Sequence, residues 1–189
     1  MVRKVFVYSV LATTSLGACM ILSSWATTSI EDVAQASGSG VRWFQLYICS
    51  DKEITASLVQ RAEKAGYRAL VVTIDTPMEG KKLSYLRNGF NLPSHLKIAN
   101  FSSDIIQNSL KSSQSVGAEL YHAIINSKLT WDAIAWVKSI TKLPVIVKGV
   151  LTAEDALLAV QHGVDGIMVS NHGARQLDGV LASVSYYCV

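Results

Sequence analysis

The residues best suited to chemistry follow a short apolar segment near the end of the chain. This segment, Gly166–Ser170, leads directly into Asn171 and His172, and Arg175 comes three residues later. A histidine titrates near neutral pH, so it can accept or release a proton during a reaction. The planar fork of an arginine binds a carboxylate through two hydrogen bonds. A lone histidine is more often structural, but this combination makes His172 a catalytic candidate.

Four other apolar segments also end in polar residues. All five segments are short and almost continuously apolar, which is typical of parallel strands covered on both faces. The predicted strands are Cys19–Ser23, Trp43–Tyr47, Leu70–Ile74, Val145–Lys148 and Gly166–Ser170. Their polar ends are Ser23 and Ser24, Gln45 and Tyr47, Thr73 and Asp75, Lys148, and Ser170 to His172.

A unit of helix, glycine, short strand and polar tip recurs along the chain. Its clearest copies are Arg61–Asp75 and Leu157–Gly173. In both, a glycine suited to a left-handed helix end precedes a hydroxyl residue by seven positions. The same offset joins Gly17 to Ser24 in a fainter copy. The clear pairs are Gly66 with Thr73 and Gly163 with Ser170.

The apolar run Val5–Leu22, after Arg3 and Lys4, resembles a signal peptide or a weak membrane anchor. Because the repeat offset extends into this run, we predict a helix followed by a buried strand instead, and expect no membrane partner. Other helices are predicted at Lys52–Ala65, Trp131–Ile140 and Ala153–His162, the last capped by Thr152 with Asp155 three residues on.

Alternating strands and helices indicate a parallel α/β fold. A doubly wound sheet would usually have a glycine-rich phosphate turn after an early strand, and the chain lacks one. A barrel gathers polar groups at the carboxyl ends of many strands, because its active site lies on that face. We therefore predict one domain over residues 1–189, an incomplete (β/α)8 TIM barrel with about five of the eight strands. The polar stretch at about 77–129 is predicted to be a loop over the active-site face.

The composition excludes some classes of protein. Half of the 189 residues are hydrophobic and 16% are charged, which indicates one well-buried globular domain. The net charge of +3 and the scattered basic residues do not favour a nucleic-acid partner. Cys19, Cys49 and Cys188 lie far apart without metal-ligand spacing, so we expect no metal site and a reducing compartment.

At its strand ends the sequence resembles the FMN-dependent 2-hydroxy-acid oxidase family, the glycolate oxidase group. The matching segments are LSSWATTSIEDVA, FQLYI, VVTIDTP, LPVIVKGV and GIMVSNHGARQLDG, within about Gly17 to Ala182. The last contains SNHGxRQLD, the active-site signature of that family. The resemblance implies FMN as cofactor and a small (S)-2-hydroxy acid and O2 as reaction partners, with a 2-oxo acid and H2O2 as products. It also implies a homo-oligomer, commonly a tetramer.

The resemblance further implies a role for each matching residue. His172 matches the catalytic base, and Asp75 matches the carboxylate that orients this base. Lys148 would lie beside the pyrimidine edge of the flavin, where its charge favours the anionic reduced ring. The implied substrate-binding residues are Tyr47, Arg175, Lys82 and Trp25, and the implied flavin contacts are Ser23, Gln45, Thr73 and Lys148.

The chain departs from the family pattern at three places. Lys82 stands where the family has a second substrate arginine, so the charge is kept but the fork is lost. The first strand of the family, with an early substrate tyrosine, has no counterpart. Nor do the later DGG and GR segments that bind the FMN phosphate. We therefore expect a pattern truncated at both ends and a chain that is poorly soluble and colourless when expressed alone.

Three alternatives stay open at this point. The chain could be an inactive truncated fragment, a family dehydrogenase with another electron acceptor, or a different phosphate-binding barrel. The last alternative predicts a catalytic cysteine loop, which the sequence does not show. The resemblance implies a peroxisomal or cytoplasmic location, although the final residues Tyr187-Cys188-Val189 are not an SKL-like signal.

Overall fold

The computed structural model describes residues 3–89, 92–102, 104 and 124–186. Its five strands form one sheet, in which every neighbouring pair is parallel and the spatial order follows the chain order. The strands are β1 (Met20–Ser23), β2 (Arg42–Leu46), β3 (Leu70–Thr73), β4 (Val145–Val150) and β5 (Gly166–Val169). Each lies within two residues of its predicted bounds, so the predicted parallel strands are confirmed.

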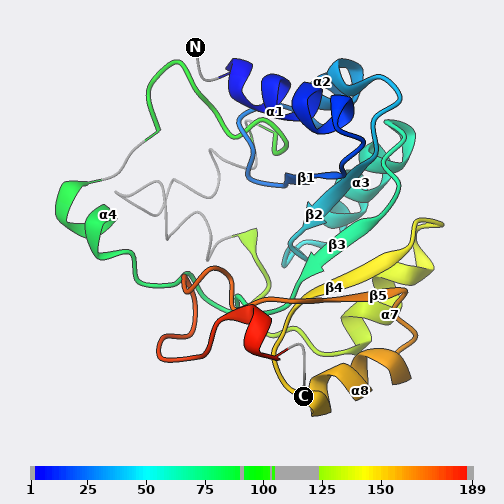
Figure 1. Ribbon diagram of the computed structural model, residues 1–189, viewed down its shortest axis with the longest axis vertical. Helices are drawn as coiled ribbons and strands as arrows, with labels where there is room; N and C mark the ends of the chain where they lie inside the picture. The colour runs from blue at the N-terminus through cyan, green and yellow to red at the C-terminus, as the bar shows by residue number, and fades with distance from the viewer. Residues whose placement is uncertain (1–2, 90–91, 103, 105–123, 187–189) are drawn as a thin grey trace.

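Helices surround the outer side of this sheet. Figure 1 shows α1, α2, α3, α7 and α8 around that side, whereas α4 lies apart from them beyond the opposite side. The predicted helices at 52–65, 131–140 and 153–162 are confirmed as α3, α7 and α8. The bounds are α1 (Arg3–Ser15), α2 (Ile30–Ser37), α3 (Lys52–Lys64), α4 (Leu83–Asn88), α7 (Asp132–Ser139), α8 (Ala153–Gln161) and a 3-10 helix η1 (Ser183–Tyr186).

The alternation of side chains along each strand separates the core from the inner face. On β2, for example, Phe44 and Leu46 are fully buried, whereas Trp43 and Gln45 are only partly buried. The apolar residues that pack toward the helices form one continuous core. The strand residues of this core are Met20, Leu22, Phe44, Leu46, Leu70, Val72, Val145, Val147 and Val150. The inner face is therefore free to carry polar groups.

The helix ends confirm the repeat that the sequence predicts. Gly66 and Gly163 have φ angles of +75° and +68°, and Gly17 has +65°, so all three adopt the left-handed backbone. Thr152 caps α8, because its Oγ1 accepts a hydrogen bond from the Asp155 amide at 3.1 Å. The helix and strand predicted for the N-terminal apolar run are confirmed as α1 and β1.

Two parts of the structure differ from the predictions. Helix α2 was not predicted, although Ser29 caps it by accepting a hydrogen bond from the Asp32 amide at 3.0 Å. The stretch 77–129 was predicted to be a loop, which is wrong at α4, a short helix that ends at Gly89 with a φ of +58°. Residues 90–91, 103 and 105–123 of that stretch lie outside the described residues.

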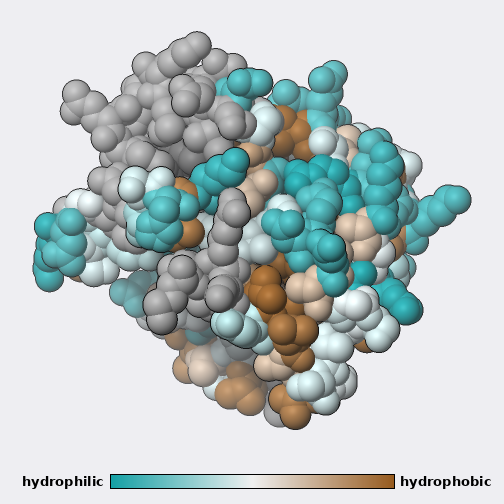
Figure 2. All heavy atoms as spheres, turned by 90° about the horizontal axis from the view of Figure 1, so that it is seen from above, coloured by the Kyte–Doolittle hydropathy of each residue, from teal (hydrophilic) through white to brown (hydrophobic). Residues whose placement is uncertain are grey.

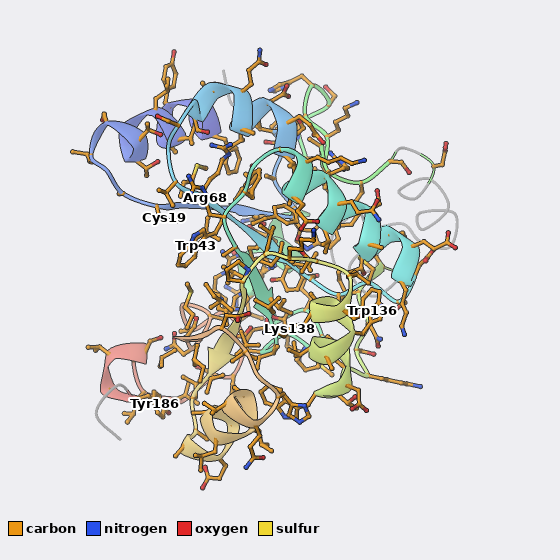
Figure 3. All side chains as sticks on the ribbon, turned by 90° about the vertical axis from the view of Figure 1, so that its right-hand side faces the viewer. Cys19, Trp43, Arg68, Trp136, Lys138 and Tyr186 are labelled. Atoms are coloured by element: carbon orange, nitrogen blue, oxygen red, sulfur yellow. The ribbon has the colours of Figure 1, made fainter. Side chains whose placement is uncertain are left out.

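The described surface is mixed in character. Figure 2 shows hydrophobic patches among mostly hydrophilic side chains on the face seen from above. Within the described ranges, no helix is both long and apolar enough to cross a membrane. An ion pair at 2.8 Å between Lys138 of α7 and Asp165 ties that helix to the start of β5 (Figure 3). This pair lies at the amino end of the strand, away from the polar strand ends.

Arg42 is a buried cation at the start of β2. Its guanidinium donates hydrogen bonds to Ser37 Oγ at 2.7 Å and to the carbonyl oxygens of Gly40 and Ala65 at 3.0 and 2.9 Å. It also lies over the ring of Tyr67, 5.5 Å from the centroid. One side chain therefore joins the end of α2, the connection to β2 and the end of α3.

Replacing Arg42 with lysine is expected to lower the free energy of unfolding by about 1–3 kcal/mol, because an ammonium cannot make the same forked contacts. Urea unfolding followed by circular dichroism measures the change. Arg68→Lys is the matched control, since Arg68 is exposed and its replacement should cost less than about 0.5 kcal/mol. Equal losses in the two variants would contradict this account.

Candidate active site

The four predicted flavin contacts point toward one face of the sheet. Ser23 is the register partner of Gln45, and Thr73 is the partner of Lys148. Gln45 pairs with Val71, and Thr73 is two residues further along the same strand. Because side chains two apart lie on the same face, the set shares the inner face at the carboxyl end of the sheet. The strand register thus brings these residues together.

Gln45 is held in a defined orientation by its neighbours. Its Nε2 donates to Thr73 Oγ1 at 2.9 Å, and its Oε1 accepts from the Ser24 amide at 3.2 Å. The Ser23 hydroxyl accepts a hydrogen bond from the Trp25 amide at 3.1 Å. These bonds link β1, β2 and β3 where the strands end. The result is an ordered row of polar groups rather than a set of free surface side chains.

Lys148 is the cation of this row. It is half-buried, and burial lowers the pKa of its ammonium, partly offset by the negative charge of Asp75. Among the described residues, its Nζ makes no hydrogen bond and no ion pair. A half-buried ammonium without a partner suits an anionic ligand on the inner face.

Asp75 and His172 are in direct contact at this end of the sheet. His172 Nδ1 lies 2.8 Å from Asp75 Oδ1, and Thr76 Oγ1 donates to the same oxygen at 3.0 Å. Burial alone would raise the pKa of Asp75. The hydrogen bond and charge of His172, the charge of Lys148 and the Thr76 hydroxyl together outweigh burial and lower it.

The contact with the carboxylate of Asp75 determines the tautomer of His172. An ionised carboxylate only accepts hydrogen bonds, so the contacting Nδ1 of His172 must carry the hydrogen. The other ring nitrogen, Nε2, then has the free lone pair when the ring is neutral. The pair therefore presents a base whose orientation is set by Asp75.

The backbone around His172 is strained. His172 and Ala174 have φ angles of +58° and +57°, which L-residues rarely adopt. Asn171 supports this turn, since its Oδ1 accepts from the Gly173 amide at 3.0 Å and its own amide donates to Ser183 Oγ at 2.9 Å. The His172 amide also donates to Ser170 Oγ at 3.0 Å. These bonds hold the imidazole over the strand ends.

Tyr47 and Arg175 lie around the same pair. A hydrogen bond links the side chains of Tyr47 and Thr76, and burial is the main reason that the pKa of Tyr47 is raised. The charge of Arg175 acts in the opposite direction on that hydroxyl, so Arg175 is close enough for its field to matter. Arg175 is exposed, and among the described residues its guanidinium makes no hydrogen bond or ion pair.

The structure places Lys82 and Trp25 differently from the other predicted residues. Lys82 Nζ forms an ion pair with Glu79 Oε1 at 2.5 Å and lies over the Tyr85 ring, 5.3 Å from the centroid. Its charge is therefore partly neutralised, and no described contact joins it to His172. Trp25 follows β1 and packs against Phe101, with ring centroids 5.1 Å apart.

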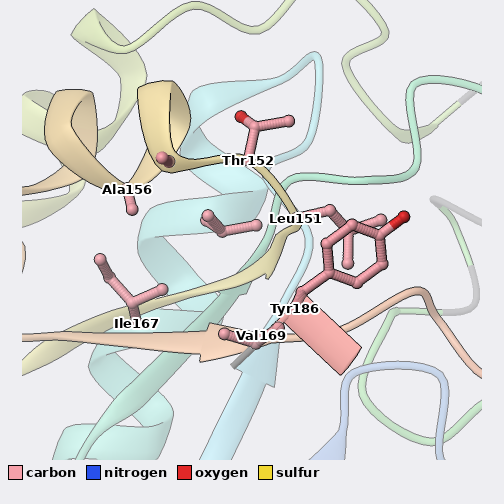
Figure 4. Close-up of a pocket in the computed structure, with 8 residues that line it drawn as sticks. Leu151, Thr152, Ala156, Ile167, Val169 and Tyr186 are labelled. Carbon is pink, nitrogen blue, oxygen red and sulfur yellow. The ribbon is translucent and has the colours of Figure 1, made fainter. Parts of the chain in front are cut away.

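Among the described residues, two of the cavities lie near the strand ends. A small one of about 60 Å³ is lined by Tyr47, Thr73 and Thr76, among others, so it adjoins the candidate site. A larger one of about 290 Å³ lies between β4, β5, α8 and η1. Figure 4 shows Ala156, Ile167, Val169 and Tyr186 around it, and it contains none of the predicted site residues.

Sequence reasoning missed several residues that shape the site. Gly149 has a φ of +115°, and a Cβ there would meet the Cβ of Asp75 at 2.5 Å, so only glycine leaves room for this carboxylate. Thr76 contacts Asp75 and His172, and Gln176 bonds to the backbone after β3. The glycine after Lys148 and the polar residues inside the motifs were visible in the sequence, but their contact partners were not.

The ionised form of Asp75 should stabilise the fold at neutral pH. Because its folded-state pKa is lowered, this contribution is complete above the unfolded value of about 3.9 and is lost as the pH falls through the lower folded value. The difference in unfolding free energy between the parent chain and Asp75→Asn should be about 1–3 kcal/mol near neutral pH and should shrink below about pH 4. Asp178→Asn, an exposed site on the β5 loop, controls for the loss of one charge. A pH-independent difference for Asp75→Asn would disprove the coupling.

The strained turn offers a second test. Ala174→Gly should remove about 1 kcal/mol of left-handed strain, offset in part by the greater freedom of glycine in the unfolded chain. We expect the melting temperature to stay level or rise. Ala174→Val should lower it, because a β-branched side chain tolerates a positive φ poorly. Differential scanning calorimetry of both variants measures these melting temperatures. A higher melting temperature for Ala174→Val than for the parent chain would refute the assignment of strain.

Comparisons with known proteins agree with this geometry. The family model described as FMN-dependent dehydrogenase matches residues 7–187. The 2-hydroxyacid oxidase 1 of Mus musculus is 49% identical over 179 residues, covering 93% of this chain and 48% of the relative. The glycolate oxidase of Spinacia oleracea is 47% identical over 173 residues, covering 92% of this chain and 47% of the relative.

A solved structure of mandelate oxidase with (S)-4-hydroxymandelic acid superimposes with a TM-score of 0.85 at 34% identity, covering 97% of this chain and 51% of that one. Together with the parallel sheet, this likeness confirms the predicted fold class, an incomplete (β/α)8 barrel. The chain spans about half the length of the curated relatives it matches. On the family match and these identities, the chain belongs to the FMN-dependent dehydrogenase family.

Proposed function

We propose that this chain carries the flavin-ring and substrate-binding part of an FMN-dependent oxidase. The reaction converts a small (S)-2-hydroxy acid and O2 into a 2-oxo acid and H2O2. The observation that carries the proposal is the 2.8 Å contact between His172 and Asp75 at the same strand ends as Lys148. Oxidation of the substrate requires a base that removes a proton and a cation that stabilises the anionic reduced ring of the flavin. The oriented His172 beside Lys148 would meet both requirements.

The inner face fits the ring of FMN. Gln45 presents a fixed amide, and Lys148 presents an ammonium that has no partner among the described residues. Ser23 and Thr73 add hydroxyl groups on the same face. FMN supplies, when bound, the acceptor for the two electrons that leave the substrate. Lys148 would hold the pyrimidine edge of the ring, and Gln45 would fix its register through hydrogen bonds.

His172 would act on the substrate through Nε2. Conversion of a hydroxyl carbon to a carbonyl removes two electrons and two protons, one of them from an oxygen or carbon that a base can reach. His172 Nε2 would take one proton, and the negative charge of Asp75 would stabilise the imidazolium that forms. In the overall balance, both protons and both electrons appear in H2O2.

The substrate carboxylate would be bound by Arg175 and oriented by Tyr47. Arg175 is exposed and uncommitted, so it can close on an anion through its fork. We propose a weaker role for Lys82, because Glu79 already neutralises part of its charge. Trp25, packed on Phe101, would form a wall of the pocket.

The direct test adds FMN to the purified chain and follows the quenching of flavin fluorescence. Glycolate, lactate or mandelate is then added without oxygen, and loss of the visible absorbance of the oxidised flavin measures substrate oxidation. Admission of air should yield H2O2. We expect His172→Gln to bind FMN like the parent chain but to slow flavin reduction by about 10²–10⁴-fold.

Lys148→Met should weaken FMN binding, whereas Lys142→Met, at an exposed position before β4, should not. Bound FMN that no 2-hydroxy acid reduces would favour the inactive-fragment alternative and overturn the proposal. Reduction by substrate without peroxide formation would favour a family dehydrogenase with another acceptor. A colourless chain as purified agrees with the expectation from the sequence, whereas failure to bind FMN even when FMN is added in large excess would reject the proposal.

A further inference from the structure

The partners Asp75 and His172 come from strands that are not neighbours. Asp75 follows β3 and His172 follows β5, and β4 lies between them. Strands two positions apart are separated by about 10 Å, so the two side chains must meet above β4. The ladder shifts register between Lys148 and Val150, and Gly149 leaves the space that Asp75 occupies. Something besides the sheet must therefore hold the two loops together.

Gln176 bridges these loops through three hydrogen bonds. Its Nε2 donates to the carbonyl oxygens of Asp75 and Met78 at 3.2 and 2.9 Å, and its Oε1 accepts from the Gly80 amide at 2.9 Å. The amide of one side chain thus binds three backbone groups of residues 75–80. All three hydrogen bonds go to backbone groups of the loop that carries Asp75, so they set the orientation of the Asp75 side chain.

Gly80 completes the contact from the other side. A Cβ at this position would lie 2.0 Å from the Arg175 carbonyl oxygen and 2.7 Å from Gln176 Oε1. Both distances are far below van der Waals contact, and the first involves backbone that cannot move aside cheaply. The loop after β3 and the loop after β5 therefore touch closely only because residue 80 has no side chain.

We propose that Gln176, seated against Gly80, is a positioning residue that holds Asp75 in line with Nδ1 of His172. It contacts neither flavin nor substrate, and its effect passes through the Asp75–His172 pair. The effect of Gln176 on catalysis rests on the proposed function, whereas its effect on the contact between Asp75 and His172 does not. The hydrogen bonds of Gln176 to residues 75–80 and its contact with Gly80 are called the Gln176 clamp below. Because Gln176 follows Arg175 in the sequence, this clamp also fixes the backbone of Arg175, the candidate carboxylate-binding residue.

The test reads the imidazole directly. Nitrogen-15 NMR of the histidine-labelled chain, without flavin or substrate, reports which ring nitrogen of His172 carries the hydrogen, with His172→Gln used to assign the signal. In the parent chain we expect the Nδ1–H tautomer. In Gln176→Ala we expect a mixture of both tautomers, because Asp75 is no longer held against Nδ1.

Three variants make the result decisive. Gln161→Ala removes an exposed glutamine at the end of α8 and should leave the spectrum of His172 unchanged. Gly80→Ala disturbs the Gln176 clamp from the loop after β3 and should also produce a mixture of tautomers. If Gln176→Ala does not fold, Gln176→Glu replaces it, since glutamate keeps the length and the acceptor but loses the two donated bonds.

An unchanged His172 spectrum in the folded Gln176 and Gly80 variants would overturn the proposal. With FMN bound and turnover present, kcat in Gln176→Ala should fall by about 10- to 100-fold with a smaller change in KM. A chain that shows the tautomer change but no turnover would support the clamp while rejecting the proposed oxidase. The two conclusions therefore fail separately.

Discussion

The hydrogen bond between Asp75 and His172 is the contact on which the rest of the site depends. It joins the ends of two strands across a third, and it needs a bulge without a side chain at Gly149 and a left-handed backbone at His172. It also needs Asp75 to be ionised in a half-buried place, where solvation is reduced. The cations and hydroxyl around Asp75 supply that stabilisation, and in return the carboxylate fixes the ring.

The same strands serve the core and the site because their side chains alternate. Residues such as Phe44 and Val147 pack against the helices, and their neighbours Gln45 and Lys148 face the other way. The polar face carries a cost: burial lowers the pKa of Lys148, which means that the fold disfavours the charged ammonium. An apolar residue there would avoid this cost, and the proposed binding of the flavin would give the charge of the lysine a role.

The ion pair between Glu79 and Lys82 changes what the sequence suggests about substrate binding. A lysine at the position of a second substrate arginine suggests by itself a weaker but still available anion site. The ion pair changes that expectation, because a carboxylate of the chain competes with any substrate carboxylate for the ammonium. Arg175 thus becomes the main candidate for substrate binding, and its exposure leaves it able to close on a ligand.

The sequence alone determined the five parallel strands, the helices α1, α3, α7 and α8 and the polar residues at the strand ends. These features are local: apolar runs, caps such as Thr152 and left-handed glycines such as Gly66 depend on residues close in the chain. Helices α2 and α4 and the contacts of Lys82 with Glu79 and Tyr85 are just as local, but they were not predicted. Only the tertiary structure decided the roles of Thr76, Gly149 and Gln176, because their contacts join residues far apart in the chain. Whether a glycine makes room for a carboxylate depends on the register of the sheet, and no local pattern encodes that register.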